Sequence, residues 1–134
     1  MSEQITKEQL FGGIAAPSEP HMACVLLLDI SSSMKGAPIQ SLNEAIAKFK
    51  QQVCQDPLAR KRVEVAIVTF ETHVEIVSDF MPIDQMPAIT LEPGGQTHMA
   101  EAIQVAIDLV KKRTREYQGV GVPCFKPWIF MITD

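Results

Sequence analysis

The chain has 134 residues, of which 46% are hydrophobic and 21% are charged, and its net charge is -4. These values predict one globular domain with a hydrophobic core and argue against long disordered regions. The net negative charge, without a face rich in Lys and Arg, argues against nucleic-acid binding, and no hydrophobic run is long enough to span a bilayer.

The cysteines and the first ten residues indicate the compartment. Cys24, Cys54 and Cys124 form an odd set without the spacing of a metal site, which is typical of reduced thiols. The sequence of residues 1–10 lacks the basic region and the hydrophobic region of a secretory signal. We therefore expect a cytoplasmic protein.

The chain opens with a segment that differs from the rest. Residues 1–20 mix charges with glycine and proline, which predicts an N-terminal arm ahead of a domain over residues 21–134. Residues 22–28 are almost continuously hydrophobic, which predicts a strand buried on both faces, as in the centre of a parallel sheet.

A one-sided helix follows this strand. Pro38 fits the first turn of a helix, and the helix is predicted to end at Asp56 and Pro57. Hydrophobic residues recur at helical spacing at Ile39, Leu42, Ile46, Phe49 and Val53. The polar residues between them, Asn43 among them, predict a solvent-facing side.

The middle of the chain predicts a β-hairpin and a loop. Residues 62–70 are rich in β-branched residues and predict a strand, and residues 74–77 predict a second one. Because only three residues separate them, the second strand has to return antiparallel to the first. Residues 80–96 contain three prolines and two glycines, which predicts a loop.

The last elements are a helix and a strand. Helical spacing begins near Thr97, and residues 127–133 predict a second strand with two hydrophobic faces, in which Trp128 and Phe130 are expected to be core residues. The order strand, helix, strand, strand, loop, helix, strand predicts an α/β fold. Its sheet is open and mostly parallel, with one antiparallel edge strand and helices on both faces.

Oxygen-bearing side chains follow the two most hydrophobic strands. Asp29, Ser31 and Ser33 place three hard oxygen donors in one turn, which suits Mg²⁺, Mn²⁺ or Ca²⁺, although such a turn alone can be a structural loop. Asp134 ends the last strand, and right-handed crossovers place the two strands side by side with their carboxyl ends at one rim. Thr97 adds a hydroxyl at that rim, or is a helix N-cap.

These positions resemble the von Willebrand factor A domain family and its metal-ion-dependent adhesion site. That site is written D-x-S-x-S, then a distant Thr, then a distant Asp. Asp29-Ile30-Ser31-Ser32-Ser33, Thr97 and Thr133-Asp134 match the three parts, the last of which the family writes in a T-D-G context, within a resemblance that covers about residues 22–134. The runs PIQSLNEAI, VEVAIVTF and KPWIFMITD resemble the bacterial tellurium-resistance-type branch of the family.

The resemblance implies a Rossmann-like fold and a divalent ion, usually Mg²⁺, bound by Asp29, Ser31 and Ser33. Thr97 would enter the coordination shell or act through water, and Asp134 would act mainly through water. The implied function is not enzymatic. It is binding of a protein partner whose carboxylate completes the octahedron, because a site with only two carboxylates keeps affinity for a third. The branch implies a stress or tellurium-resistance system.

Two features depart from the family pattern. Ser32 stands where close relatives often have glycine, so we expect a slightly altered turn and an intact site. The family continues beyond Asp134 through a further helix and about two strands, so we expect a C-terminally truncated fold in which residues 129–133 lack a neighbouring strand. Because an unpaired hydrophobic edge promotes self-pairing, we expect a homodimer, a domain swap or marginal stability.

An enzyme is the alternative. Asp29 could be the nucleophile of a Mg²⁺-dependent phosphohydrolase or phosphotransferase. That chemistry normally needs a second carboxylate two residues later, where this chain has Ser31. Neither GGQTHM nor GVGVP forms a nucleotide-binding fingerprint. We therefore favour the interaction module.

Overall fold

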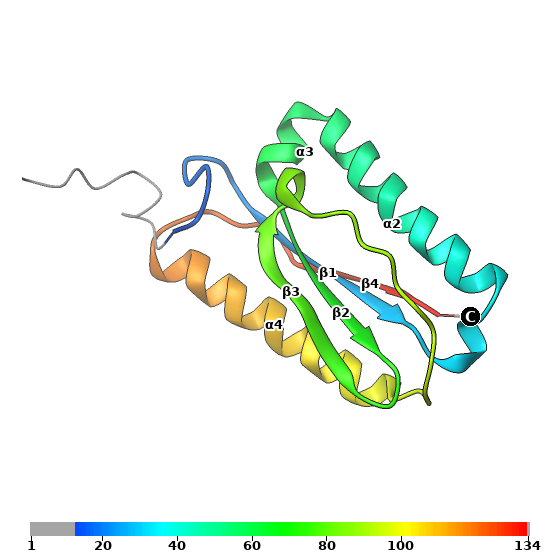
Figure 1. Cartoon of the computed structure of the whole chain (residues 1–134). Helices are drawn as coiled ribbons and strands as arrows, with labels where there is room; N and C mark the ends of the chain where they lie inside the picture. The colour runs from blue at the N-terminus through cyan, green and yellow to red at the C-terminus, as the bar shows by residue number, and fades with distance from the viewer. Residues whose placement is uncertain (1–12, 134) are drawn as a thin grey trace, which may run out of the picture.

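The computed structural model describes residues 13–133 of the chain. Three parallel strands and one antiparallel strand form a single sheet, with helices on both sides of it (Figure 1). The elements in chain order are β1 Met22–Asp29, η1 Ser32–Met34, α2 Ala37–Gln55, α3 Pro57–Arg62, β2 Val63–Phe70, β3 Val74–Pro82, η2 Ile83–Gln85, α4 Met99–Gly119 and β4 Trp128–Ile132.

The sheet has the strand order β3-β2-β1-β4. β1 pairs in parallel with β2 and with β4, and β2 pairs antiparallel with β3. In this register Asp29 lies opposite Phe70, and Leu28 lies opposite Ile132. The predicted fold class, a mostly parallel sheet with one antiparallel edge strand, is confirmed.

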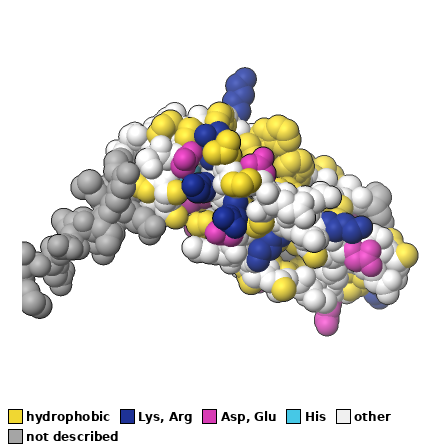
Figure 2. All heavy atoms as spheres, turned by 90° about the horizontal axis from the view of Figure 1, so that it is seen from above, with side chains coloured by type: hydrophobic (Ala, Val, Ile, Leu, Met, Phe, Trp, Pro, Cys, Tyr) yellow, Lys and Arg dark blue, Asp and Glu magenta, His cyan; other side chains and the backbone are white. Residues whose placement is uncertain are grey.

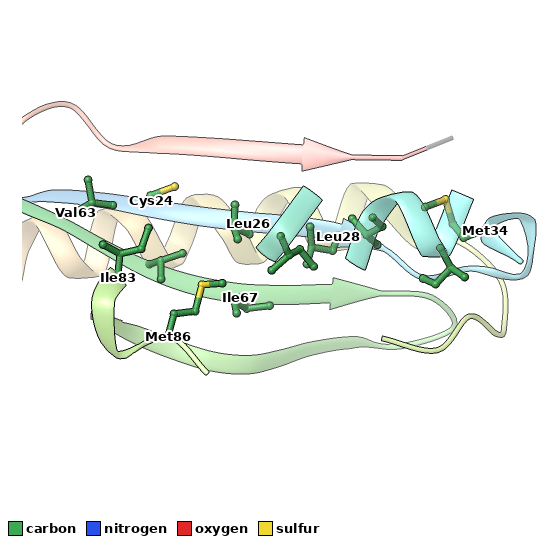
Figure 3. Close-up of a cluster of buried hydrophobic side chains, with 12 residues drawn as sticks. Cys24, Leu26, Leu28, Met34, Val63, Ile67, Ile83 and Met86 are labelled. Atoms are coloured by element: carbon green, nitrogen blue, oxygen red, sulfur yellow. The ribbon is translucent and has the colours of Figure 1, made fainter. Parts of the chain in front are cut away.

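The hydrophobic core forms two layers, one on each face of β1. Because successive side chains of a strand point to opposite faces, Leu26 and Leu28 pack in the layer of α2, whereas Val25 and Leu27 pack in the layer of α4. In Figure 3 the labelled side chains of β1 and β2 form one cluster with Met34, Ile83 and Met86. This cluster reaches the end of the sheet where β1 meets the serine turn.

A third, smaller cluster involves the segment before β1. Ile14 is buried and packs with Ala23, Tyr117 and Val122, a contact that the glycine- and proline-rich composition did not predict. Residues 1–12 lie outside the described residues, so the boundary between an arm over 1–20 and a domain over 21–134 stays a prediction.

Three element boundaries differ from the sequence expectation. The chain forms α3 directly after α2, because the Asp56 carboxylate accepts hydrogen bonds from the backbone N–H groups of Leu58 and Ala59 at 2.9 and 3.3 Å and caps the new helix. β3 extends to Pro82 instead of ending at residue 77. α4 begins at Met99 with His98 as N-cap, so the interpretation of Thr97 as the N-cap is wrong.

The expected burial of the last strand is also wrong. Trp128 is 53% exposed and Phe130 is 36% exposed. β4 pairs with β1 only, at the edge of the sheet formed by the described residues. A hydrophobic pattern indicates a strand but not its position in the sheet, and an edge strand has fewer neighbours to cover it.

Other surfaces carry mixed side chains. Figure 2 shows the molecule from the side of α2 and α3, where Lys and Arg side chains are interspersed with Asp, Glu and hydrophobic ones. Within residues 13–133, no helix combines the length and the hydrophobicity that crossing a membrane requires.

Candidate metal site

The serine turn begins at the carboxyl end of the central strand. Asp29 is the last residue of β1 and is 1% exposed, and Ser31 is 2% exposed. The N–H of Ile30 donates to the Phe70 carbonyl at 3.0 Å, so β2 holds the first residue of the turn. The N–H of Ser31 donates to Asp29 Oδ1 at 2.8 Å, and this bond folds the chain back over the carboxylate.

Two serine hydroxyls lie next to this carboxylate. Ser31 Oγ and Ser33 Oγ are 3.1 Å apart, close to the ~3.0 Å between neighbouring oxygens around an octahedral Mg²⁺ with bonds of about 2.1 Å. Met34 ends the 3₁₀ turn and is buried in the core, which anchors the turn. Because Ser31 is buried and Ser33 is exposed, the pair opens toward solvent.

The turn that precedes Thr97 lies against the serine turn. The N–H of Gly94 donates to the Ile30 carbonyl at 2.8 Å, and the Gly95 carbonyl accepts from the N–H and the Oγ of Ser32 at 3.0 and 2.9 Å. The structure thus brings residues 94–97 to the rim that also holds Asp29. Thr97 itself is exposed, two residues beyond this contact.

Gly95 is required by its surroundings. Its φ is +76°, and a Cβ at this position would lie 2.5 Å from both Glu71 Oε2 and Thr72 Oγ1. The hairpin turn after β2 therefore packs directly on residue 95, and Thr72 Oγ1 accepts a hydrogen bond from the Gln96 N–H at 3.0 Å. Only glycine combines a positive φ with this close approach.

Thr133 lies beside Asp29, a role that the sequence pattern did not assign to it although Thr133-Asp134 matched the motif. Its hydroxyl donates to Asp29 Oδ2 at 2.6 Å, because parallel pairing of β1 and β4 brings the two strand ends together. The available signal was the Thr-Asp pair at the end of the last strand, which we interpreted only through Asp134. Asp134 lies outside the described residues.

The Asp29 carboxylate is held in its ionised form. Burial raises the pKa of Asp29, but hydrogen bonds from the side chains of Ser31 and Thr133 and from the Ser31 N–H outweigh burial and bring the pKa below its ordinary value. All of these donors are neutral groups. The result is a buried negative charge beside two hydroxyl groups.

The donor set fits a hard divalent cation. Asp29, Ser31 and Ser33 offer carboxylate and hydroxyl oxygens, the ligands that Mg²⁺ and Ca²⁺ prefer, and neither thiolate nor imidazole nitrogen is among them. Across residues 13–133, no three His, Cys, Asp or Glu side chains gather into a metal site. Among the described residues, the carboxylate of Asp29 and the hydroxyls of Ser31 and Ser33 are therefore the candidate ligands at this rim.

Comparison with known proteins gives the family. The family model described as von Willebrand factor type A domain matches residues 24–134. The chain therefore belongs to the von Willebrand factor type A domain family, whose members are commonly protein-interaction modules. No curated protein matches the chain significantly.

Solved structures with a similar fold include two of a bacterial pili tip protein. The vWF domain of Mfa5, the type V pili tip protein of Porphyromonas gingivalis, is 25% identical with a TM-score of 0.52, over 69% of this chain and 33% of that chain. A structure of three N-terminal domains of Mfa5 gives 25% identity and a TM-score of 0.53, over 69% of this chain and 18% of that chain.

An uncharacterized membrane spanning protein from Vibrio fischeri shares the fold, at 16% identity and a TM-score of 0.53 over 70% of this chain and 51% of that chain. The matched region thus spans about half or less of each of these chains.

Proposed function

We propose that this domain binds a protein partner through a divalent metal ion held at the serine turn. One observation carries the proposal: the buried Asp29 carboxylate has neutral donors and adjoins two hydroxyl oxygens 3.1 Å apart. In this proposal the ligands are Asp29, Ser31 and Ser33, with Thr97 and Asp134 completing the set directly or through water. Mg²⁺ is the proposed ion, with Mn²⁺ and Ca²⁺ as alternatives.

The chain's own groups prepare this site. The Ser31 N–H and the Thr133 hydroxyl fix the two oxygens of Asp29, so little ordering is left to occur on binding. Ser33 and Thr97 are exposed, so the rim is accessible to another protein. A bound divalent ion would supply the positive charge that attracts an acidic side chain of the partner.

The environment of Asp29 favours this function over phosphoryl transfer. Enzymes that use an aspartate as the nucleophile of phosphoryl transfer normally need a second carboxylate two residues later, and this chain has Ser31 there. This feature supports a role without catalysis.

The sequence runs that resemble the tellurium-resistance-type branch support a setting in a cytoplasmic bacterial stress response. The test of the proposal is capture of a partner on the immobilised chain with Mg²⁺, with EDTA and after Mg²⁺ is restored. We expect a bound protein that EDTA releases, that Mg²⁺ restores and that Asp29→Ala does not capture.

The matched control for this capture experiment is Asp56→Ala, which removes an exposed carboxylate from the cap of α3. This control should capture the partner as the wild type does. Capture that is indifferent to EDTA and to Asp29→Ala would contradict the proposal.

The exposed edge strand supports self-association as a second property. Four consecutive residues of β4, from Trp128 to Met131, are at least 36% exposed, and no charged residue lies between Pro127 and Thr133. Two copies can therefore pair their β4 edges without like charges facing each other.

Light scattering tests this self-association. The wild type should be a dimer and Met131→Lys a monomer, whereas Val77→Lys on β3, at the opposite edge of the sheet, should remain a dimer. A monomeric wild type would contradict the pairing.

A further inference from the structure

The segment that carries Thr97 to the metal site is long and irregular. Residues 86–98, which we call the strap, contain neither helix nor strand. The strap runs along α2 and across the carboxyl ends of β1 and β2 before α4 begins (Figure 1). Irregular segments of this length are uncommon in compact domains and usually have a function. The strap therefore needs contacts that hold it in one conformation.

Asn43 of α2 holds the middle of the strap. Its Nδ2 donates to the Leu91 carbonyl at 3.1 Å, and its Oδ1 accepts from the Leu91 N–H at 2.9 Å. One side-chain amide thus satisfies both backbone polar groups of a single strap residue, as a neighbouring strand would. The Leu91 side chain is partly buried against the α2 core layer.

The strap is also held on either side of Leu91. At its start, Lys50 Nζ donates to the Met86 carbonyl, and the Met86 side chain is buried. At its far end, Gly94 bonds to Ile30 and Gly95 bonds to Ser32. Leu91 lies between these two contacts, so its position limits where residues 94–97 can lie.

We propose that Asn43 is a positioning residue for the metal site, acting through Leu91 on residues 94–97. The part of this proposal that concerns the metal rests on the proposed function. Without the two hydrogen bonds between Asn43 and Leu91, residues 87–93 sample more conformations, and ordering them lowers the free energy gained when the site binds its metal. In the wild type the strap is already ordered before the metal binds.

Amide hydrogen exchange without metal tests the positioning itself. Asn43→Leu removes both hydrogen bonds at similar side-chain size, and Asn43→Asp keeps only the acceptor. Gln51→Leu makes the same kind of change at an exposed position of α2 and is the matched control. Folding of each variant is checked by circular dichroism.

For Asn43→Leu we expect faster exchange at Leu91 and also at Ser32, Gly94 and Gln96. The Ser32 N–H donates to the Gly95 carbonyl of the strap, and the N–H groups of Gly94 and Gln96 donate from the strap to Ile30 and Thr72. Asn43→Asp should show a smaller increase, and Gln51→Leu should show none. Faster exchange confined to Leu91 would overturn the proposal, because the hydrogen bonds of Asn43 would then order Leu91 alone and not residues 94–97.

Calorimetric titration with Mg²⁺ tests the consequence for the metal. Residues that orient metal ligands typically contribute 10-fold to 100-fold to affinity, so we expect Asn43→Leu to bind Mg²⁺ about tenfold more weakly than the wild type. Asn43→Asp should show a smaller loss of affinity, and Gln51→Leu should bind Mg²⁺ as the wild type does. Unchanged affinity in Asn43→Leu would overturn the role at the metal site. If the wild type itself binds no Mg²⁺, the proposed function fails, and the exchange experiment alone decides whether Asn43 positions residues 94–97.

Discussion

Two carboxylates on neighbouring strands, Asp29 and Glu64, are both buried, at 1% and 3% exposure, but their partners differ. Glu64 lies at the start of β2 and accepts hydrogen bonds from Arg113 Nε and Nη2 at 2.9 and 3.0 Å and from the Tyr117 hydroxyl. Asp29 lies at the other end of the sheet and accepts from the neutral groups of Ser31 and Thr133.

This difference separates a structural carboxylate from a candidate functional one. A buried charge is costly unless it is paired. Glu64 has its cation within the chain, and burial together with the Glu64 charge raises the pKa of Tyr117 so that its hydroxyl remains a donor. Asp29 has hydrogen bonds but no cation among these donors, and in the proposed function a metal ion from solution pairs with its charge.

A third buried ionisable group avoids a buried charge by staying protonated. Cys24 lies on β1 with 0% exposure, and burial raises the pKa of its thiol to about 12. This thiol therefore stays neutral across the physiological range. The three groups avoid an unpaired buried charge in three ways: Glu64 by an internal cation, Asp29 by a proposed external cation and Cys24 by protonation.

The largest expected effect concerns the internal cation. Arg113→Leu leaves the Glu64 carboxylate buried without its charge partner and should lower the free energy of unfolding by about 3–5 kcal/mol, as measured by denaturant titration. Adding Glu64→Gln to this variant should restore part of the loss, because it removes the unpaired charge. Lys112→Leu, an exposed change on the same helix, is the control. A loss below about 1 kcal/mol for Arg113→Leu would show that Glu64 does not depend on its cation.

A smaller effect is expected from Cys24 at alkaline pH. Its thiol ionises near 9.0 in the unfolded chain and near 12 in the folded one, so ionisation above pH 9 favours the unfolded state. Stability from this group is complete below pH 9 and falls by about 1.4 kcal/mol per pH unit as the pH rises toward 12.

Unfolding curves of the wild type and Cys24→Ala between pH 8 and 11 measure this contribution. The difference in unfolding free energy between the two chains should shrink above pH 9. Val25→Ala, a buried change on the same strand that removes no ionisable group, is the control, and its difference from the wild type should stay constant over this range. A constant difference for Cys24→Ala would contradict the assignment.

The smallest effect concerns the neutral donors to Asp29. Thr133→Val removes the hydroxyl that donates to Asp29 Oδ2 and should lower the free energy of unfolding by about 1 kcal/mol at neutral pH. Thr133→Ser keeps a hydroxyl and should lose less. Chemical denaturation of the three chains makes this comparison, and equal stability of Thr133→Val and the wild type would mean that this bond does not support the carboxylate.

Most of the fold could be predicted from the sequence, because the hydrophobic periodicity of β1, α2 and β2 is strong and the short β2–β3 turn allows only one direction of pairing. The hydrophobic pattern alone could not show that β4 is an exposed edge, since Trp128 and Phe130 look the same in a central strand and in an edge strand. Only the family resemblance indicated that residues 129–133 lack a neighbouring strand. α3 was missed because we interpreted Asp56 and Pro57 only as the end of α2, although Asp at the N-cap followed by Pro at the first helical position is also the pattern that begins a helix.

The candidate site was predictable where its residues are close in sequence. Asp29, Ser31 and Ser33 lie in one turn, and the structure places them together. Thr133 and Asn43 were missed because their roles depend on strand pairing and on the path of the strap; by its spacing alone, Asn43 belongs to the solvent side of α2. Metal binding by Asp29, Ser31, Ser33, Thr97 and Asp134 stays a prediction.

Calorimetric titration of Mg²⁺ into the wild type and into Asp29→Asn measures whether the serine turn binds a metal ion through Asp29. Asparagine keeps an oxygen acceptor for the Ser31 N–H and removes the charge, so the turn should survive while the cation loses its main attraction. We expect saturable heat for the wild type and for the control Asp56→Asn, and none for Asp29→Asn. Identical heats for the wild type and Asp29→Asn would contradict metal binding through Asp29.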